Sequence, residues 1–88
     1  MDVAFDHAEA SAAVEALRST ARLLDRQTDA RVRLAATAQR DWRGRARATF
    51  DGELRRLTRE AADLSDACRR AAAAIEAATD AAAAASSG

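Results

Sequence analysis

The chain has 88 residues, no proline and only three glycines, and its 14 arginines balance 14 acidic residues. A formal net charge of zero argues against a strongly nucleic-acid-binding or membrane-surface protein. No apolar run approaches the roughly 20 residues that span a bilayer, so stable membrane insertion is not expected.

Alanine, arginine, leucine and glutamate dominate the sequence, and all four are strong helix formers. Alanine buries little area, so a single 88-residue chain of this composition has a thin core. Small domains of this kind are usually stabilised by disulfides, a metal or oligomerisation. The single Cys68 excludes an internal disulfide, and the sequence suggests no metal or cofactor site. Oligomerisation is therefore the expected route to stability.

The first predicted helix covers about residues 7–40. Asp6 is a candidate N-cap, with Glu9 three residues further on. The acidic N-terminus, with Asp2 and Asp6, does not resemble a secretory signal peptide. Charged residues separate apolar positions that recur at steps of three and four, which is typical of an amphipathic helix. These positions are Val14, Leu17, Ala21, Leu24, Thr28, Val32, Ala35 and Trp42, widened on one side by Leu23 and Leu34.

A turn is predicted at residues 41–45, because Gly44 is the only glycine near the midpoint of the chain. Two helical halves around such a turn predict an antiparallel helical hairpin. The fold class is therefore all-α, with one domain covering residues 1–88.

The second predicted helix covers about residues 46–82, followed by a tail, 83–88, that is expected to fray. Gly52 lies inside this helix and indicates either a close backbone approach or a tolerated loss of helix propensity. Apolar residues follow a heptad spacing over more than four repeats, as in a coiled coil. This seam consists of Phe50, Leu54, Leu57, Ala61, Leu64, Cys68, Ala71, Ile75, Ala78 and Ala82.

Few residues suggest chemistry. His7 has no second ligand nearby, and Cys68 lies on the seam, where it is either a small buried side chain or part of a disulfide between two chains. Carboxylate pairs such as Asp25/Asp29 are interleaved with arginines, which indicates a salt-bridged surface. No catalytic residue is therefore predicted.

The turn is rich in arginine, with Arg40, Arg43, Arg45 and Arg47. Without interleaved aromatic residues, this pattern favours an ordinary solvated turn or docking to an acidic protein surface over nucleic-acid binding. Trp42 is either a cap on the end of the core or an interface anchor, a role in which tryptophan is enriched.

Trp42, Gly44, Ala46 and Phe50 fit the pattern Trp-x-Gly-x-Ala-x-x-x-Phe. With its central position in a short helical chain, this motif resembles the WXG (Esx-like) family of small type VII secretion substrates, and the resemblance covers roughly residues 3–78. Abundant arginine and alanine fit a GC-rich, actinobacterial source. The resemblance implies helical hairpins that pair, as homodimers or heterodimers, into four-helix bundles and are exported folded by an ATPase-driven machine. In that family Trp-x-Gly forms one half of a composite export signal.

The other half of that signal is a Tyr-x-x-x-Asp/Glu motif after the second helix, and this sequence departs from that motif. The chain contains no tyrosine, and Glu76 stands where the tyrosine would precede Asp80. The resemblance therefore implies that a partner supplies this half, or that the chain is a divergent or unexported member.

The leading hypothesis is a non-enzymatic subunit that is exported from the cytoplasm without a signal peptide, with a second hairpin and the secretion ATPase as partners. In this hypothesis the bundle core holds Val14, Leu17, Leu24, Leu54, Leu57, Leu64, Cys68 and Ile75. The alternative is a cytoplasmic coiled-coil adaptor or chaperone for a toxin or effector that is not itself exported.

Overall fold

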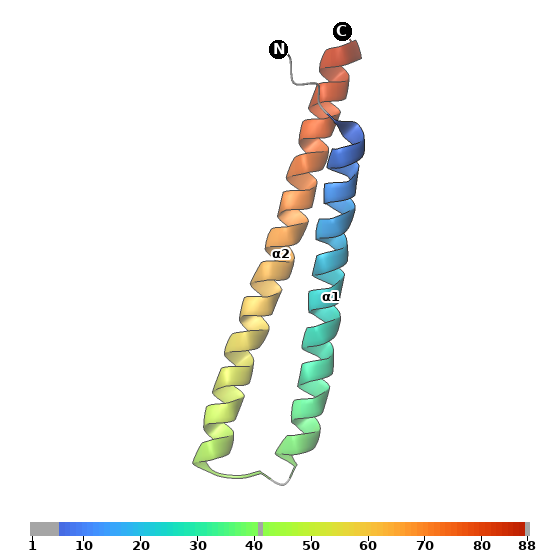
Figure 1. Cartoon of the computed structure of the whole chain (residues 1–88). Coiled ribbons are helices and arrows are strands. Elements are labelled where there is room, and N and C mark those ends of the chain that lie inside the picture. The colour runs from blue at the N-terminus through green and yellow to red at the C-terminus, as the bar shows by residue number, and fades with distance from the viewer. Residues whose placement is uncertain (1–5, 41, 88) are drawn as a thin grey trace.

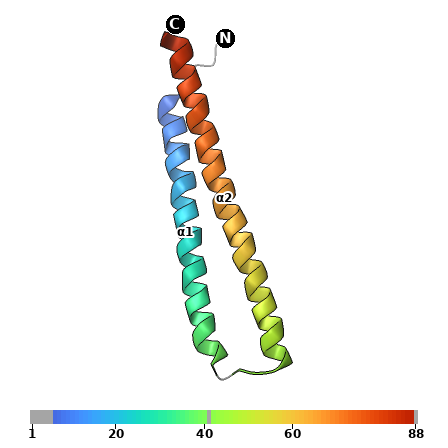
Figure 2. The ribbon, with the colours of Figure 1, turned by 180° about the vertical axis from the view of Figure 1, so that it is seen from behind.

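The computed structural model describes residues 6–40 and 42–87, and shows two antiparallel helices joined by a short turn (Figure 1). Helix α1 spans His7–Gln39 and helix α2 spans Arg45–Ser87. The described part of the chain measures 66 × 20 × 16 Å, so the hairpin is a rod. The turn lies at one end, which we call the turn end, and the start of α1 and the end of α2 lie at the other, the open end (Figure 2). The predicted all-α hairpin is confirmed.

Helix α1 begins at the predicted cap. The backbone N–H of Glu9 donates to Oδ1 of Asp6 at 3.0 Å, and Asp6 has extended backbone angles, as an N-cap should. The helix ends at Gln39, one residue before the predicted end, and the N–H of Arg40 closes its last turn on the carbonyl of Thr37 at 3.5 Å. Neither helix of the described chain is long and apolar enough to cross a membrane.

Gly44 makes the reversal possible. It has φ of +86°, a region that residues with a Cβ rarely adopt. Its carbonyl accepts the N–H of Ala48 at 3.1 Å, so the hydrogen bonding of α2 starts from this residue. The predicted turn is therefore confirmed around Gly44, whereas Asp41 lies outside the described residues.

Helix α2 is longer than predicted. It continues from residue 82 to Ser87, through the segment that was expected to fray. Alanine has the highest helix propensity, and no proline or glycine interrupts this segment before Gly88. Gly52 does not mark a close approach, because a Cβ built there would meet only Nη2 of Arg55, at 4.0 Å.

The two helices pack against each other along two rows of residues on each helix. The residues of a row are seven positions apart, and we label the two rows a and d. Row a holds the fully buried small residues Ala21 and Ala72, both 0% exposed, and Ser65, 1% exposed. Row d of α2 is half-buried and holds Leu54, Ala61, Cys68 and Ile75. On α1 the rows hold Val14, Leu17, Ala21, Leu24, Thr28 and Ala35, all buried or half-buried as predicted. The two helices also lie closer together toward the open end than near the turn (Figure 1).

The predicted seam of α2 divides into two rows. Row d faces α1, but every second predicted residue lies one row to the side, in row g: Phe50, Leu57, Leu64, Ala71 and Ala78. Leu57 is 39% exposed and Leu64 is 54% exposed, so α1 covers neither of them fully. Val32 of α1, 44% exposed, is likewise at the flank of the seam. The reason is steric, because closely spaced helices need small residues such as Ser65 and Ala72 between them.

Candidate functional site

The turn presents an aromatic pair. The ring centroids of Trp42 and Phe50 are 5.0 Å apart and their planes are tilted by 47°, an arrangement in the range that aromatic pairs prefer. Phe50 is half-buried, while Trp42 remains 37% exposed. Trp42 therefore packs against Phe50 at the turn end of the hairpin while part of its surface stays exposed to solvent.

Polar contacts fix this turn. The N–H of Trp42 donates to the carbonyl of Gln39 at 3.2 Å, and Nη1 of Arg47 donates to the carbonyl of Trp42 at 3.4 Å. Asp51 forms an ion pair with Nε of Arg47 at 3.6 Å and accepts a hydrogen bond from the side-chain amide of Gln39. Asp51 thus connects the end of α1 to the start of α2, and holds the backbone that carries Trp42.

The other motif residues lie at the surface of the turn. Gly44 and Ala46 are both exposed, and the arginines predicted to enrich the turn are exposed at Arg40, Arg43 and Arg45. The structure therefore brings Trp42 and Phe50 into contact and leaves Ala46 open to solvent in the first turn of α2. Exposed arginines therefore flank Trp42 in the sequence on both sides of the turn.

One side of the hairpin is polar. Residues that flank the seam on this side, which we label row e, form ion pairs between α1 and α2. Arg18 donates to Glu76 through both terminal nitrogens, at 2.5 and 3.0 Å. Nη2 of Arg69 donates to Oδ2 of Asp25 at 2.6 Å.

Ser65 joins the second of these pairs from the core. Its hydroxyl donates to Oδ1 of Asp25 at 2.8 Å and accepts from Nη1 of Arg69 at 2.5 Å. The hydrogen bond from Arg69, and then that from Ser65, lowers the pKa of Asp25. The hydrogen bond from Arg18 likewise lowers the pKa of Glu76. Both carboxylates are therefore held in their charged form.

On the opposite side, row g of α2 is apolar. Leu34 of α1 is 73% exposed and shares an open groove of about 370 Å³ with Phe50 and Leu57 of α2. The groove is also lined by Ala35, Ala38 and Leu54, and by the charged residues Arg31 and Glu53. Leu64 extends this row one heptad toward the open end. We call this surface, from Leu34 and Phe50 to Leu64 and on to Ala71 and Ala78, the apolar face.

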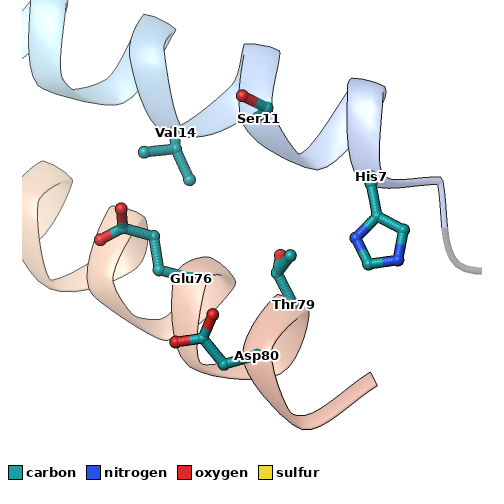
Figure 3. A pocket seen from close by; sticks show the side chains of 6 residues that line it. All are labelled: His7, Ser11, Val14, Glu76, Thr79 and Asp80. Carbon is teal, nitrogen blue, oxygen red and sulfur yellow. The ribbon is translucent and has the colours of Figure 1, made fainter. Parts of the chain in front are cut away.

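A second recess, of about 360 Å³, lies near the open end, where α1 and α2 contribute the side chains shown in Figure 3. Val14 points toward α2 and Thr79 points toward α1, while Glu76 and Asp80 lie along the α2 side. These two acidic residues occupy the positions where the WXG-like pattern has Tyr-x-x-x-Asp/Glu. Glu76 forms an ion pair with Arg18 of α1.

The predicted core residues separate into two groups. Val14 is buried, and Leu17, Leu24, Leu54, Cys68 and Ile75 are half-buried between the helices, whereas Leu57 and Leu64 belong to the apolar face. Cys68 is a free thiol in the single chain. Within residues 6–40 and 42–87, no three His, Cys, Asp or Glu side chains are grouped so that they could hold a metal ion.

The sequence interpretation missed the residues of the polar side, because a pairing such as Arg18 with Glu76 joins positions 58 residues apart. The signal available was their spacing: Arg18, Asp25 and Gln39 fall in one row of α1, and Arg69 and Glu76 fall in one row of α2.

Comparisons with known protein families, curated proteins and solved structures find no match for this chain.

Proposed function

We propose that this chain is a non-enzymatic, WXG-like type VII secretion substrate or partner subunit that pairs with another helical hairpin in a four-helix bundle. The observation that carries the pairing is the division of the hairpin into two unlike sides. One side is closed by ion pairs between α1 and α2, and the other presents Leu34, Leu57 and Leu64. Solvation of such large side chains is unfavourable by roughly 1.5–3 kcal/mol each relative to full burial.

The turn supports the secretion part of the proposal. Trp42 and Gly44 occupy the tip of the hairpin, and Phe50 positions the indole. A partly exposed tryptophan is suited to anchoring a partner or a component of the secretion machinery. The tip is therefore the proposed contact for the export ATPase, and the apolar face the proposed contact for the second hairpin.

Pairing is tested by Leu64→Asp, with Ala62→Asp as the matched control. Both variants add a carboxylate to an exposed position of α2, two residues apart, but Ala62 lies in row e and Leu64 in the apolar face. We expect light scattering to show loss of the assembled species only for Leu64→Asp, because pairing would bury its charge. Circular dichroism should show a helical chain in both cases. Assembly that survives Leu64→Asp contradicts pairing through this face.

Export is tested by following the tagged chain in culture medium, with and without the type VII ATPase and with co-expressed hairpin partners. Trp42→Ala is expected to remain helical and to lose export or partner binding. Arg43→Ala, which changes the variable residue of the Trp-x-Gly motif, is its control and should be exported. Equal export of both variants would show that Trp42 has only a structural role.

The second candidate is a cytoplasmic adaptor or chaperone for a toxin or effector. It is favoured by the missing tyrosine and by the engagement of Glu76 with Arg18 at the position where that tyrosine would stand. Both candidate functions use the apolar face. They differ in that the chain is exported in the first and stays in the cytoplasm in the second. Retention of the chain in the cytoplasm with every partner, whether or not the ATPase is present, selects the adaptor.

A further inference from the structure

The polar side of the hairpin changes character near the turn. In row e of α1, Arg18 pairs with Glu76 of α2. Seven residues further on, Asp25 pairs with Arg69. The next residue of this row is Val32, an apolar side chain that is 44% exposed. Within the described part of the chain, no ion pair joins the two helices between this level and the turn, so the ion-paired surface ends here.

A recess of about 420 Å³ opens on the same side of the hairpin at this level. Val32 of α1 and Leu54 of α2 give it an apolar wall, and Arg55, Thr58 and Arg59 complete its lining. The volume lies within the range of about 300–1,000 Å³ that is usual for small-molecule sites, which often lie between the helices of a bundle. Leu54 also lines the groove of the apolar face, so the two hollows lie on opposite sides of the seam.

The polar groups of this recess have no partners among the described residues. Arg55 and Arg59 are exposed and form no ion pair there, and their four-residue spacing places them on one face of α2. Thr37 and Thr79 each donate a hydrogen bond to the carbonyl four residues earlier, whereas the half-buried Thr58 makes no such bond. The recess therefore offers two guanidinium groups and a hydroxyl beside an apolar wall.

We propose that this recess binds a single-chain amphiphile with an anionic head group, such as a fatty acid. Arg55 and Arg59 donate hydrogen bonds to the head, because guanidinium groups match a carboxylate with two parallel N–H···O bonds and stay charged. The acyl chain lies across Val32 and Leu54, where its CH₂ groups leave water. The inference goes beyond the proposed function, which uses the opposite side of the hairpin.

The distribution of charge along the chain favours an anion at this place. Residues 31–59 hold nine arginines and three acidic residues, whereas the rest of the chain is net negative. The formal charge of zero therefore conceals a positive segment around the turn, and both arginines of the recess belong to it. Such a segment raises the local concentration of anions. The apolar wall then selects an anion that carries a chain over a small hydrophilic one.

The two parts of the ligand are tested separately by isothermal titration calorimetry of the whole chain. Decanoate, kept below its micelle-forming concentration, carries both the head and the chain. Acetate carries only the head, and decanol carries only the chain. We expect decanoate to bind at least about tenfold more tightly than either of the others, because it makes both sets of contacts.

The role of the guanidinium groups is tested by the double variant Arg55→Gln with Arg59→Gln. Its matched control is Arg26→Gln with Arg70→Gln, which removes the same charge from two exposed arginines that form no ion pair with the described residues. Decanoate binding should weaken about tenfold in the first double variant and change little in the second. Circular dichroism should show that both remain helical, since all four side chains are exposed.

The place of binding is tested by Val32→Asp against Leu34→Asp. Both residues are exposed on α1 and lie two positions apart, but Val32 lines the recess and Leu34 lines the groove of the apolar face. We expect only Val32→Asp to lose decanoate binding.

Four results overturn the inference. Absence of decanoate binding removes it outright. Loss of binding in Leu34→Asp, with binding kept in Val32→Asp, places the ligand on the apolar face. Equal affinity for decanoate and for decanol or acetate shows that the head or the chain is not recognised. Equal weakening in the two arginine double variants attributes binding to overall charge. The proposed function is unaffected by these results, because its own tests measure pairing and export.

Discussion

Trp42 and Phe50 are eight positions apart in the sequence and their ring centroids lie 5.0 Å apart across the start of α2. Phe50 is thus the surface on which the only tryptophan of the chain rests. The spacing of the motif has a structural basis, since Phe50 lies about one and a half turns into α2, where its ring meets that of Trp42.

Phe50→Ala should therefore release Trp42 into solvent. We expect a red shift of the tryptophan emission and a loss of stability of about 1 kcal/mol from the aromatic contact alone. Leu23→Ala is the control, because it removes an apolar side chain that is 48% exposed and lies far from the turn along α1. Fluorescence spectra and urea unfolding measure both effects. An unchanged emission maximum for Phe50→Ala contradicts the contact.

Gly44 and Gly52, the two glycines that the structure describes, should respond to alanine in opposite directions. Gly52→Ala is expected to stabilise the chain by about 0.5–1 kcal/mol, because the Cβ meets nothing closer than 4.0 Å and alanine is the better helix former. Gly44→Ala should destabilise it by roughly 1–2 kcal/mol, since its φ of +86° is unfavourable for a residue with a Cβ. Nothing lies within 4 Å of a Cβ there, so backbone strain is the sole cause. Midpoints of urea unfolding give both signs, and a shift in the same direction for both variants refutes the assignment.

Ala72 should not tolerate a larger side chain. It is 0% exposed between the helices, and Ala72→Leu forces three extra carbon atoms into a packed seam. We expect a loss of about 1–3 kcal/mol. Ala77→Leu places the same side chain on an exposed position of α2 and should change stability little. Thermal unfolding compares the two variants, and equal midpoints would show that the helices do not approach closely at Ala72.

Acid should weaken the hairpin through Glu76 and Asp25. Their folded-state pKa values are lowered by Arg18 and Arg69, so the unfolded chain binds protons first as the pH falls. The stabilisation from these carboxylates is complete above the ordinary pKa values of glutamate and aspartate, and is lost as the pH drops through the lower folded-state values. The effect is modest, because both pairs are about half exposed.

Melting temperatures between neutral and acidic pH measure this effect. Glu76→Gln should lose part of the acid dependence, and it is compared with Glu60→Gln, whose carboxylate pairs only within α2, with Arg56. If the two variants follow the same pH curve as each other, the cross-helix pair contributes nothing specific to it.

Most of the fold follows from local signals in the sequence. Asp6 and Glu9 predict the start of α1, Gly44 predicts the reversal, and the absence of proline predicts two uninterrupted helices. The end of α2 was predicted too early, because the prediction weighed the lack of bulky side chains above the helix propensity of alanine. The Trp-x-Gly motif lies at the turn, where Trp42 packs against Phe50.

Local signals in the sequence are enough to specify two amphipathic helices that turn back at Gly44. Periodicity alone could not decide which of two adjacent rows of α2 faces α1, since Leu54 and Leu57 both repeat every seven residues. The tertiary structure decided this, because the space between close helices admits Ser65 and Ala72 at their nearest approach, and displaces the rows of larger side chains to the flank. It also paired Arg18 with Glu76 on one side and left Leu34 and Leu64 on the other, a division that depends on residues far apart in the chain.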